Sequence, residues 1–529
     1  MLPKLSTRPA ARRCACAGAL TLALLGAGLP VAAGAGRADH APLARFYDQK
    51  LKWAACDDID APKDLQCGKV TVPLDYTKPR GATLDLALAR YRASGRSRGS
   101  LVLNFGGPGG PGVPELAADG AEFMDLTNNY DVVTFDPRGV GRSSPVTCGD
   151  GADGASQAAV GTVTVGDPAA MLRQLKSVAD LCARYSGPVA AHIGTTEAAR
   201  DLDVLRAALG DKKLNYLGFS YGTRLGAVYA AEFPHKVGRM ALDGVDTLTE
   251  PLSRQGLAGA EGQQTALDDF LDWCVQDIAC PFGDDRRQAG DNVVQLVRDL
   301  DRQPVATGLG GQLTGQELVG AIGQALYSKE LWPSLERALA SLVDDGDTRG
   351  VEAFSADGLT LPYRGRPARG SAGRLVDPDD VPADNLPAAL MAINCADDPD
   401  RPGAARLTGD VRRLAAAYEH ASPVFGRYRL AQQLMCYGRP KGTDFIRRKV
   451  KDVDSARLLL VGTRGDPATP YRWTVETARR LGPAAVVLDN KGEGHTGYGS
   501  SRCVHRKVDD FLMYGTLPPN GSSCLADEA

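Results

Sequence analysis

Short apolar runs bounded by turn residues recur along the first half of the chain and return near its end. Their length and their β-branched or apolar content are typical of strands, and eight of them span residues 70–76, 84–91, 101–105, 132–135, 216–219, 240–243, 458–461 and 485–488. Segments with apolar residues at helical spacing alternate with the later runs, at residues 197–209, 223–233, 472–481 and 503–514. This alternation predicts an α/β fold with an eight-stranded, mostly parallel sheet covered by helices on both faces. The first two strands are expected to form an antiparallel hairpin at one edge.

The pattern changes between the sixth and the seventh predicted strand. Helical segments separated by Gly- and Pro-rich loops dominate there, at residues 263–275, 291–300, 315–326, 332–343 and 411–419. A separate domain in tandem is the alternative, but the sheet needs its last two strands from beyond these helices. We therefore expect a large helical cap at residues 250–440, inserted between core parts at residues 36–249 and 441–529.

The first 35 residues have the pattern of an export signal. An apolar run over residues 17–33 ends in a small-x-small cleavage site, Ala33-Gly34-Ala35, and is preceded by four basic residues, Lys4, Arg8, Arg12 and Arg13. Gly26, Gly28 and Pro30 interrupt the run, whereas a membrane-spanning helix needs ~20 apolar residues. We expect residues 1–35 to be a cleaved signal peptide and the mature chain to be secreted and extracellular, without stable membrane insertion.

Ten cysteines follow the predicted signal, and an even number in an exported chain favours disulfides. The sequence alone allows many pairings. We predict bonds between neighbours along the chain, each closing a short to medium loop: Cys56 with Cys67, Cys148 with Cys182, Cys274 with Cys280, Cys395 with Cys436, and Cys503 with Cys524. No C-x2-C pair occurs and only six histidines are present, so no metal site and no cofactor are expected.

The balance of acidic and basic residues bears on whether the protein binds nucleic acid. Lys and Arg number 61 against 64 Asp and Glu, which gives a formal net charge of −3, and no block of like charge occurs. A protein that binds the phosphates of nucleic acid needs a basic surplus, so we expect no nucleic-acid partner.

A G-x-S-x-G pentapeptide from Gly218 to Gly222 carries Ser220 at its centre. It follows one predicted strand and precedes one predicted helix, so the serine side chain should project above the carboxyl edge of the sheet. A plain Gly-rich turn is the alternative, but it does not account for the strand and the helix on either side. We predict that Ser220 is a nucleophile above a helix N-terminus, which favours developing negative charge.

A serine hydroxyl needs a positioned base and an acid that orients this base. His495 directly follows the last predicted strand, where such a base is placed, whereas His505 lies within a helix beside basic neighbours and is expected at the solvated surface. Asp466 follows the seventh strand and keeps the chain order serine, acid, histidine. Asp243, at the end of the sixth strand, is its rival. We favour Asp466 as the acid and His495 as the base.

A glycine-rich loop at residues 104–112, Asn-Phe-Gly-Gly-Pro-Gly-Gly-Pro-Gly, follows the third strand. Glycines let a backbone approach a tetrahedral oxyanion closely, so we predict an oxyanion hole made of the N–H groups of Gly107 and Tyr221. Gly106 and Gly109 are alternatives to Gly107. A phosphate-binding loop is excluded, because no G-K-[ST] follows.

The segment Asp-Pro-Arg-Gly-Val-Gly-Arg-Ser closes the fourth strand at residues 136–143, and we interpret a pair between its Asp and an Arg of the segment as structural and not catalytic. With the Gly-Gly-Pro-Gly loop, Gly-Phe-Ser-Tyr-Gly-Thr, Gly-Thr-Arg-Gly-Asp-Pro-Ala-Thr-Pro and Gly-His-Thr, this segment resembles the prolyl-aminopeptidase-like branch of the α/β-hydrolases. The export signal, the large cap and the Tyr-Gly-Thr-Leu-Pro tail before Cys524 look like the secreted bacterial tripeptidyl aminopeptidases. Prolyl aminopeptidases begin the glycine loop with His where this chain has Phe105, which disfavours release of single prolines.

The resemblance implies the α/β-hydrolase fold and a serine exopeptidase that releases tripeptides from free N-termini of peptides or proteins, through an acyl-enzyme on Ser220. Three extended residues span ~10 Å, so an anchor for the substrate ammonium should lie at that distance from the serine. Acids of the cap are candidates for this anchor: Asp397, Asp398, Glu261 and Asp268. A secreted carboxylesterase or lipase, a prolyl aminopeptidase with the same triad, and a non-catalytic binding protein on this fold are the alternatives.

Overall fold

The computed structural model describes residues 42–149, 167–248, 250–308, 311–357, 373–398, 400–440 and 450–527. The predicted signal peptide lies outside the described residues. Within these ranges, no helix combines the length and the apolar character that crossing a bilayer requires.

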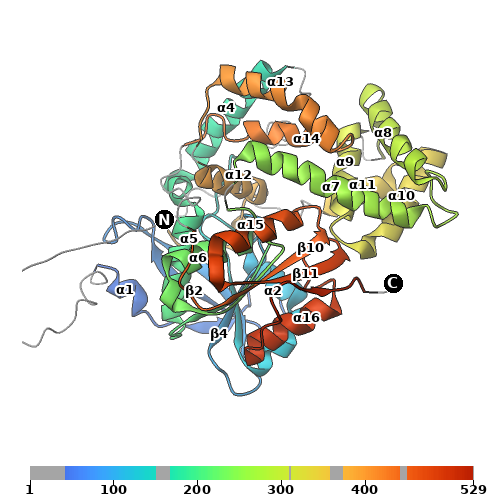
Figure 1. Cartoon of the computed structure of the whole chain (residues 1–529). Helices are drawn as coiled ribbons and strands as arrows, with labels where there is room; N and C mark the ends of the chain where they lie inside the picture. Colours follow the sequence, from blue (N-terminus) through green and yellow to red (C-terminus); the bar gives the residue numbers. More distant parts are fainter. Residues whose placement is uncertain are drawn as a thin grey trace, which may run out of the picture. The chain divides into compact units, whose positions relative to one another are not determined.

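One large mixed sheet organises the chain (Figure 1). Its ten strands run in the order β1-β2-β3-β5-β4-β6-β7-β10-β11-β12. Their bounds are β1 Trp53–Ala55, β2 Gln66–Pro73, β3 Thr83–Tyr91, β4 Ser100–Asn104, β5 Asp131–Phe135, β6 Leu214–Phe219, β7 Val237–Asp243, β10 Leu458–Gly465, β11 Ala485–Glu493 and β12 Ser522–Cys524. The eight predicted strands are β2 to β7, β10 and β11, so the predicted α/β sheet is confirmed. The sequence pattern missed the short edge strands β1 and β12.

The pairing of neighbouring strands changes once across the sheet, from antiparallel to parallel. β1, β2, β3 and β5 pair in antiparallel fashion, including the predicted β2–β3 hairpin. Every neighbouring pair from β5 to β12 is parallel. Because parallel strands share one direction, the loops that follow β4, β6, β7, β10 and β11 meet at one edge of the sheet, where ligands of such folds bind.

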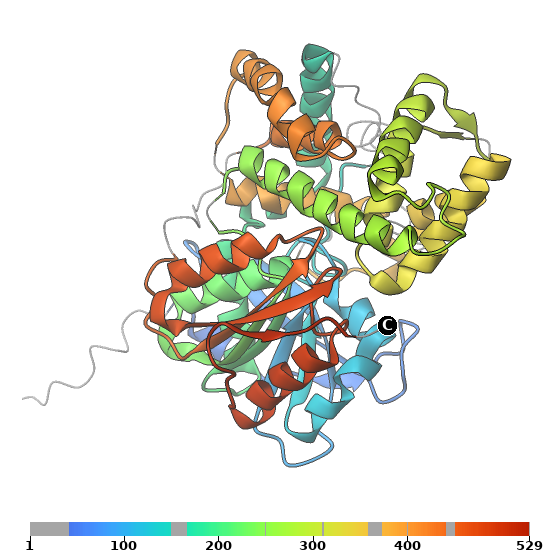
Figure 2. The same cartoon turned by 45° about the vertical axis from the view of Figure 1, so that its right-hand side comes forward.

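Helices cover both faces of this sheet (Figure 2). Neighbouring residues of a strand point to opposite faces, so Leu460 belongs to one apolar core and Val461 to the other. The first core is completed by α5 (Thr195–Ala208), α6 (Tyr221–Glu232) and α15 (Tyr471–Leu481). The second is completed by α2 (Gly112–Asp119) and α16 (Arg502–Asp509).

A helical layer separates β7 from β10 in the sequence. Part of this layer has an apolar core distinct from those of the sheet, and Phe270 and Trp332 are buried within it. Its helices are α7 Leu252–Cys274, α8 Arg286–Arg302, α9 Gly315–Ala325, α10 Trp332–Asp345, α11 Arg349–Asp357, α12 Asn385–Asp397, α13 Ala404–Ala421 and α14 Gly426–Leu430, with a hairpin of β8 Val305–Ala306 and β9 Gln312–Leu313. The predicted cap boundaries, after residues 249 and 440, adjoin residue 249 and residues 441–449, which lie outside the described residues.

The inserted layer also receives a helix that the sequence pattern missed. α4 (Pro168–Tyr185) precedes β6 in the chain but lies beside α13 (Figures 1 and 2). Met171 and Leu175 of α4 share an apolar cluster with Leu407 and Val411 of α13. Asp167 caps this helix by accepting from the backbone N–H groups of its first turn, and proline occupies its first position, which are two ordinary start signals.

All ten cysteines that follow the predicted signal lie in five disulfides. The pairs are those predicted from chain order: Cys56–Cys67, Cys148–Cys182, Cys274–Cys280, Cys395–Cys436 and Cys503–Cys524. Four of them join positions 6 to 41 residues apart in the chain. Cys148–Cys182 joins the loop after β5 to α4.

The predicted pair between Asp136 and an arginine of its own segment does not form: Arg138 pairs with Asp201, and the Arg142 side chain pairs with Asp58. Arg138 Nη2 lies 2.6 Å from Asp201 Oδ1 on α5, and both side chains are fully buried. Asp136 instead accepts from the backbone N–H groups of Val113, at 2.9 Å, and Arg142, at 3.0 Å. The two side chains leave the loop in different directions because a partner on α5 meets the buried guanidinium better than the adjacent loop can.

Candidate active site

Ser220 stands on a sharp turn between β6 and α6. Its backbone has φ 54° and ψ −123°, a strained conformation for a residue with a side chain. The Ser220 N–H donates to the Asp243 carbonyl oxygen at 2.9 Å, and the Thr223 N–H donates to the Ser220 carbonyl oxygen at 2.9 Å. A Cβ at Gly218 would lie 2.6 Å from the Gly222 carbonyl oxygen, so the turn requires glycine there. The G-x-S-x-G pattern thus produces a fixed, tight turn.

The glycine-rich loop after β4 packs directly on this turn. Gly106 has φ +97°, and a Cβ there would lie 2.6 Å from the Phe219 carbonyl oxygen, 3.0 Å from Ser220 Cβ and 3.2 Å from the Tyr221 nitrogen. Only a glycine permits so close an approach. The loop therefore brings backbone N–H groups beside the serine.

Two N–H groups of this region are available for an oxyanion. The Gly106 N–H donates to Asn104 Oδ1 at 3.2 Å and is engaged. The Gly107 N–H, one residue on, has no acceptor among the described residues. Tyr221 is the first residue of α6, and an N–H in the first turn has no acceptor inside its helix. Gly109 instead packs against α12, where a Cβ would lie 3.0 Å from Ala389 Cβ.

His495 and Asp466 meet above the ends of β11 and β10. His495 Nδ1 lies 2.9 Å from Asp466 Oδ1 and 3.0 Å from Oδ2. The Asp466 carboxylate also accepts from the N–H of Ala468 at 2.8 Å, from the N–H of Thr469 at 2.7 Å and from the Thr469 hydroxyl at 2.9 Å. These bonds fix the carboxylate, and the carboxylate fixes the ring.

The electrostatics of the pair follow from burial and mutual attraction. Burial alone would raise the pKa of Asp466, but the facing His495 and the hydrogen bonds hold this pKa below its usual range. Burial alone would lower the pKa of His495, but the Asp466 carboxylate raises it above its usual value. Asp466 is thus a carboxylate that stabilises an imidazolium opposite.

Ser220 and His495 share a neighbour in the segment after β7. The Ser220 N–H bonds the Asp243 carbonyl oxygen, and a Cβ at Gly244 would lie 3.4 Å from His495 Cε1. Among the described residues, no hydrogen bond joins the Ser220 hydroxyl to the imidazole. Such bonds are often long in enzymes without substrate and tighten when substrate binds.

Asp243, the rival acid, bonds the backbone that follows His495 and not the ring. Its carboxylate accepts from the Gly497 N–H at 3.0 and 2.9 Å and from the Tyr498 N–H at 2.7 Å. Burial raises the pKa of Asp243 to about 6. This carboxylate therefore holds the loop on which His495 stands.

Comparisons with known proteins give the family. Residues 100–356 match the family described as alpha/beta hydrolase fold, and residues 422–524 match the family described as TAP-like protein. The serine protease Hip1 of Mycobacterium tuberculosis is 33% identical over 499 residues, which cover 90% of this chain and 91% of that protein. The tripeptidyl aminopeptidase of Streptomyces coelicolor is 31% identical, over 91% of this chain and 87% of that protein. The chain belongs to the α/β-hydrolase family.

The relatives named serine protease and tripeptidyl aminopeptidase make the chain a serine hydrolase of this family, and the predicted resemblance to the tripeptidyl aminopeptidases is confirmed. A third relative, carboxylesterase B of Mycobacterium tuberculosis, is 31% identical over 96% of this chain and 97% of that protein. Relatives named as peptidases and as an esterase thus align along nearly the whole of this α/β-hydrolase.

The four acids predicted as anchors for a substrate ammonium all have protein partners in this α/β-hydrolase. Asp397 is buried beside Arg224 of α6, and Asp398 accepts from a cap backbone N–H. Glu261 pairs with an arginine at 2.9 Å and Asp268 with another at 2.6 Å. Each of these four carboxylates therefore already has a partner within the protein.

A fifth acid, Asp269 of α7, has no hydrogen-bond or ion-pair partner among the described residues. A Cβ at Gly465 would lie 2.8 Å from Asp269 Oδ2 and 3.0 Å from the Glu493 Cα, which places this carboxylate where β10 and β11 end. Glu493 itself pairs with Lys329 at 3.2 Å. Burial and then the nearby Glu493 charge raise the pKa of Asp269 to about 6. No sequence pattern singled out this residue, because its place depends on how α7 lies over the sheet.

Tyr327, which follows α9, joins the cap to the loop of His495. Its ring meets the imidazole edge to face at 5.1 Å between centroids, and its carbonyl oxygen accepts from the His495 N–H at 2.8 Å. The Tyr327 side chain remains 38% exposed. The sequence analysis missed this residue as well.

His505, predicted at the solvated surface, is half-buried, with 31% of its side chain exposed. Its ring stacks on Tyr498 at 4.1 Å, and its Nε2 lies 3.4 Å from Asp509.

Among the described residues, the one group whose donors could hold a metal ion is Cys274, Cys280 and Glu336, and its two cysteines form a disulfide. A disulfide sulfur lacks the thiolate charge that binds metal ions.

Proposed function

We propose that this serine hydrolase is a secreted exopeptidase that releases tripeptides from the free N-termini of peptides or proteins. Ser220 is the nucleophile, His495 the base and Asp466 the acid. The observation that carries the exopeptidase part is Asp269, an unpaired carboxylate at the same sheet edge. A relative named tripeptidyl aminopeptidase supports the proposal.

In the first half of the reaction, Ser220 Oγ attacks the carbonyl carbon that follows the third substrate residue. His495 Nε2 takes the hydroxyl proton, while Asp466 keeps Nδ1 protonated and stabilises the imidazolium. The tetrahedral intermediate then expels the new N-terminal amine, which receives the proton from His495. The tripeptide remains bound to Ser220 as an ester.

In the second half, His495 takes a proton from water as the water oxygen attacks this ester. The tripeptide leaves with a carboxylate terminus, and Ser220 regains its proton. The N–H groups of Gly107 and Tyr221 stabilise the oxyanion in both halves, because they are fixed by the loop and by α6 before the substrate arrives.

Sheet geometry supports Asp269 as the anchor for the substrate ammonium. Ser220 follows β6, Asp269 lies where β10 ends, and β7 lies between these two strands. Two strand spacings amount to ~10 Å, and three extended residues also span ~10 Å. A tripeptide that starts at Asp269 therefore places its third carbonyl near Ser220.

Secretion is part of the proposal. The predicted signal at residues 1–35 supports it, and so do five disulfides, which persist in oxidising compartments. N-terminal sequencing of protein recovered from culture medium tests it, with a mature start at Gly36 as the expected result.

An esterase is the second candidate function, because a relative that covers nearly the whole chain is named carboxylesterase B. The same serine, base and oxyanion hole would hydrolyse an ester, but an unpaired acid has no evident role with a neutral ester. Prolyl aminopeptidase activity is less favoured, since Phe105 begins the glycine loop.

Three substrates distinguish these functions: the p-nitroanilide of Ala-Pro-Ala, its N-acetylated form, and p-nitrophenyl butyrate. A charge-assisted hydrogen bond is worth about 1.5–3 kcal/mol, so kcat/KM for the free peptide should exceed that for the acetylated one by about 10- to 100-fold. Equal cleavage of both peptides would overturn the exopeptidase. Cleavage of the ester alone would establish an esterase.

Ser220→Ala serves as the control for all three assays. It should remove turnover and labelling by a fluorophosphonate while leaving the Tm unchanged. If the wild-type protein is inert to the substrates and to the fluorophosphonate, the α/β-hydrolase acts as a binding protein and the proposal is wrong.

A further inference from the structure

A cavity of about 220 Å³ lies between α4, the 3₁₀ helix η3 (Gly187–His192), α12 and the segment that ends at Pro440. Alanines of α4, η3 and α12 form most of its wall. Arg439 is the one charged residue among those that line it, all of which belong to the described part of the chain. The cavity is thus a small apolar chamber with a single cation.

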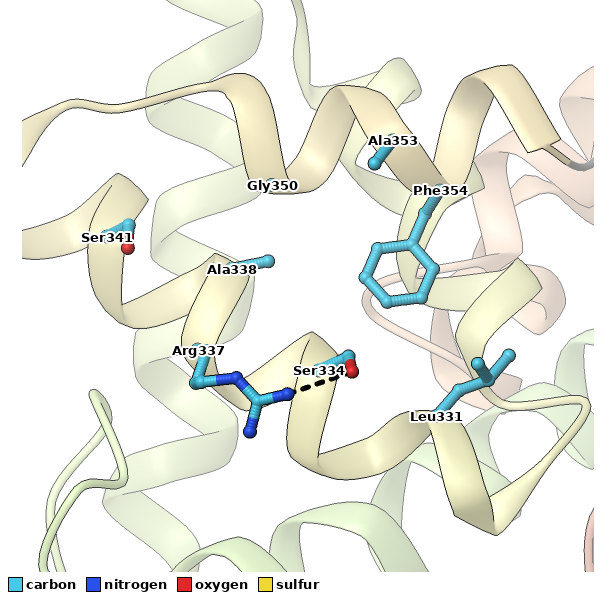
Figure 3. A pocket seen from close by; sticks show the side chains of 8 residues that line it. All are labelled: Leu331, Ser334, Arg337, Ala338, Ser341, Gly350, Ala353 and Phe354. Carbon is cyan, nitrogen blue, oxygen red and sulfur yellow. Dashed lines mark hydrogen bonds between the residues drawn. The ribbon is translucent and has the colours of Figure 1, made fainter.

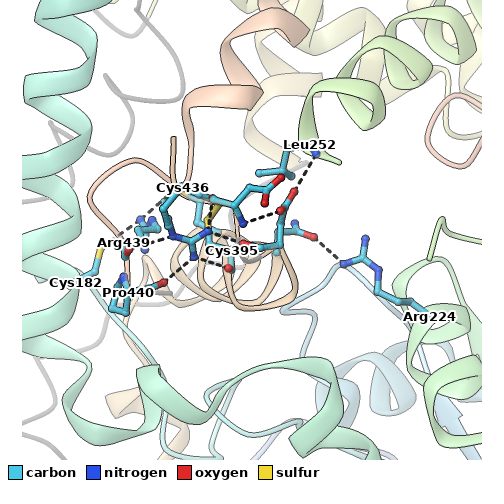
Figure 4. Close-up of a disulfide and its surroundings, with 12 residues drawn as sticks. Cys182, Arg224, Leu252, Cys395, Cys436, Arg439 and Pro440 are labelled. Atoms are coloured by element: carbon cyan, nitrogen blue, oxygen red, sulfur yellow. Dashed lines mark hydrogen bonds between the residues drawn. A yellow bond between two sulfur atoms is a disulfide. The ribbon is translucent and has the colours of Figure 1, made fainter. Parts of the chain in front are cut away.

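The Arg439 guanidinium has no oxygen partner among the described residues. Its Nη2 lies 3.6 Å from Cys182 Sγ and 3.5 Å from Met391 Sδ (Figure 4). Disulfide and thioether sulfurs are weak acceptors, so these contacts do little to replace the lost hydration of the cation. Burial, and then the neighbouring Arg401, lower the pKa of Arg439 to about 10.

Arg401 makes the surroundings more positive. Its guanidinium donates to backbone carbonyl oxygens, including those of Cys395 and Pro440, both at 2.6 Å. Burial lowers the pKa of Arg401, and the nearby Asp398 and Asp400 offset part of this shift, whereas no acid has such an effect on Arg439. An anion in the cavity would therefore meet one cation directly and a second one behind it.

We propose that this cavity binds a small monocarboxylate with a compact apolar group. The planar guanidinium of Arg439 offers two parallel N–H groups that match the two oxygens of a carboxylate. The alanine walls offer no further donor, so they suit an alkyl group better than a second charge. A volume of 220 Å³ equals about seven water molecules at ~30 Å³ each, which accommodates an acid of four or five carbons.

The site is separate from the catalytic groups. The cavity is lined by Ala388, Ala392 and Ala396 of α12, whereas another face of this helix, at Ala389, contacts Gly109 of the glycine loop. The proposal therefore does not depend on the function proposed for Ser220. Two sources of the ligand share this chemistry, a free short-chain acid and the carboxylate end of a short peptide.

The test is calorimetric titration and thermal unfolding of the full protein with butyrate, with its neutral isostere butyramide, and with N-acetyl-alanine. Butyrate should release heat on binding and raise the Tm with concentration, and butyramide should do neither. Binding of N-acetyl-alanine in place of butyrate would identify a peptide end as the source. Equal responses to butyrate and butyramide would overturn the proposal.

Variants connect the response to the cavity. Arg439→Met should abolish butyrate binding, since it keeps an unbranched apolar stem and removes the guanidinium charge. Arg337→Met is the matched control: Arg337 lines a different hollow between α10 and α11, where its Nη2 donates to Ser334 Oγ at 3.0 Å (Figure 3). If Arg439→Met does not fold, Ala392→Leu fills the cavity from its other wall and should also abolish binding. Undiminished binding in the folded variant would overturn the proposal.

Discussion

The N–H of His495 donates to the carbonyl oxygen of Tyr327 at 2.8 Å, and the two rings meet edge to face. His495 belongs to the loop after β11 and Tyr327 to the inserted cap. The proposed base is therefore held by Asp466 through its ring and by the cap through its backbone.

Tyr327→Ala should lower kcat/KM by about 2- to 10-fold, because an edge-to-face aromatic contact is worth about 0.5–1.5 kcal/mol. The backbone bond to His495 remains in this variant, and the exposed side chain is not needed for folding. Tyr327→Phe keeps the ring and should retain activity close to that of the wild type. Steady-state kinetics measure kcat/KM of both variants. An equal loss in the two would show that the hydroxyl, and not the ring, supports activity.

Asp466→Asn should cost far more activity than Asp243→Asn. Loss of the acid that bonds His495 Nδ1 reduces kcat by about 10⁴-fold in comparable triads. Asp243 bonds only the backbone of Gly497 and Tyr498, so its replacement should act mainly on the loop and on Tm. Measuring kcat of both variants on the Ala-Pro-Ala anilide tests this ranking. The opposite ranking would identify Asp243 as the acid of the triad.

The acid limb of kcat/KM should lie above pH 6.5, the ordinary pKa of histidine. The base works only when neutral, and the Asp466 carboxylate outweighs burial and raises the pKa of His495. Activity is therefore lost as the pH falls through this raised pKa. In Asp466→Asn the residual acid limb should move to lower pH, because burial then dominates. A pH profile of each protein measures the shift, and an unmoved limb would contradict the assignment.

Asp269→Asn should lower kcat/KM for the free Ala-Pro-Ala anilide by about 10- to 100-fold and leave that for the N-acetylated form unchanged. The ratio of the two values cancels the titration of His495, which both substrates share. In the wild type this ratio should fall below pH 6, since the pKa of Asp269 is about 6 and its protonation removes the anchor charge.

Asp272→Asn is the matched control for Asp269→Asn. Asp272 lies one turn farther along α7 and pairs with Arg286 at 2.8 Å, so its replacement should leave the ratio as it is in the wild type. Equal losses on the free and the acetylated peptide in Asp269→Asn would show that the acid supports the structure and not the ammonium.

Much of the fold and the residue types of the site could be predicted from the sequence, because they depend on short patterns of neighbouring residues. Short apolar or β-branched runs bounded by turn residues predicted the eight main strands. The order of the cysteines along the chain predicted the five disulfide pairs. The strand and helix around Gly218–Gly222 predicted the turn of Ser220, since its backbone strain depends on neighbours in the chain. The short strands β1 and β12 were missed because three residues carry too little pattern.

The sequence by itself determined which residues could react, and the tertiary structure decided how they are paired. Both Asp243 and Asp466 end parallel strands beside His495, and only the packed loops show that Asp466 takes the ring and Asp243 the backbone. Asp269 and Tyr327 reach the site from the cap, across long separations in the chain. Such contacts depend on how one layer lies on another, which local periodicity does not encode.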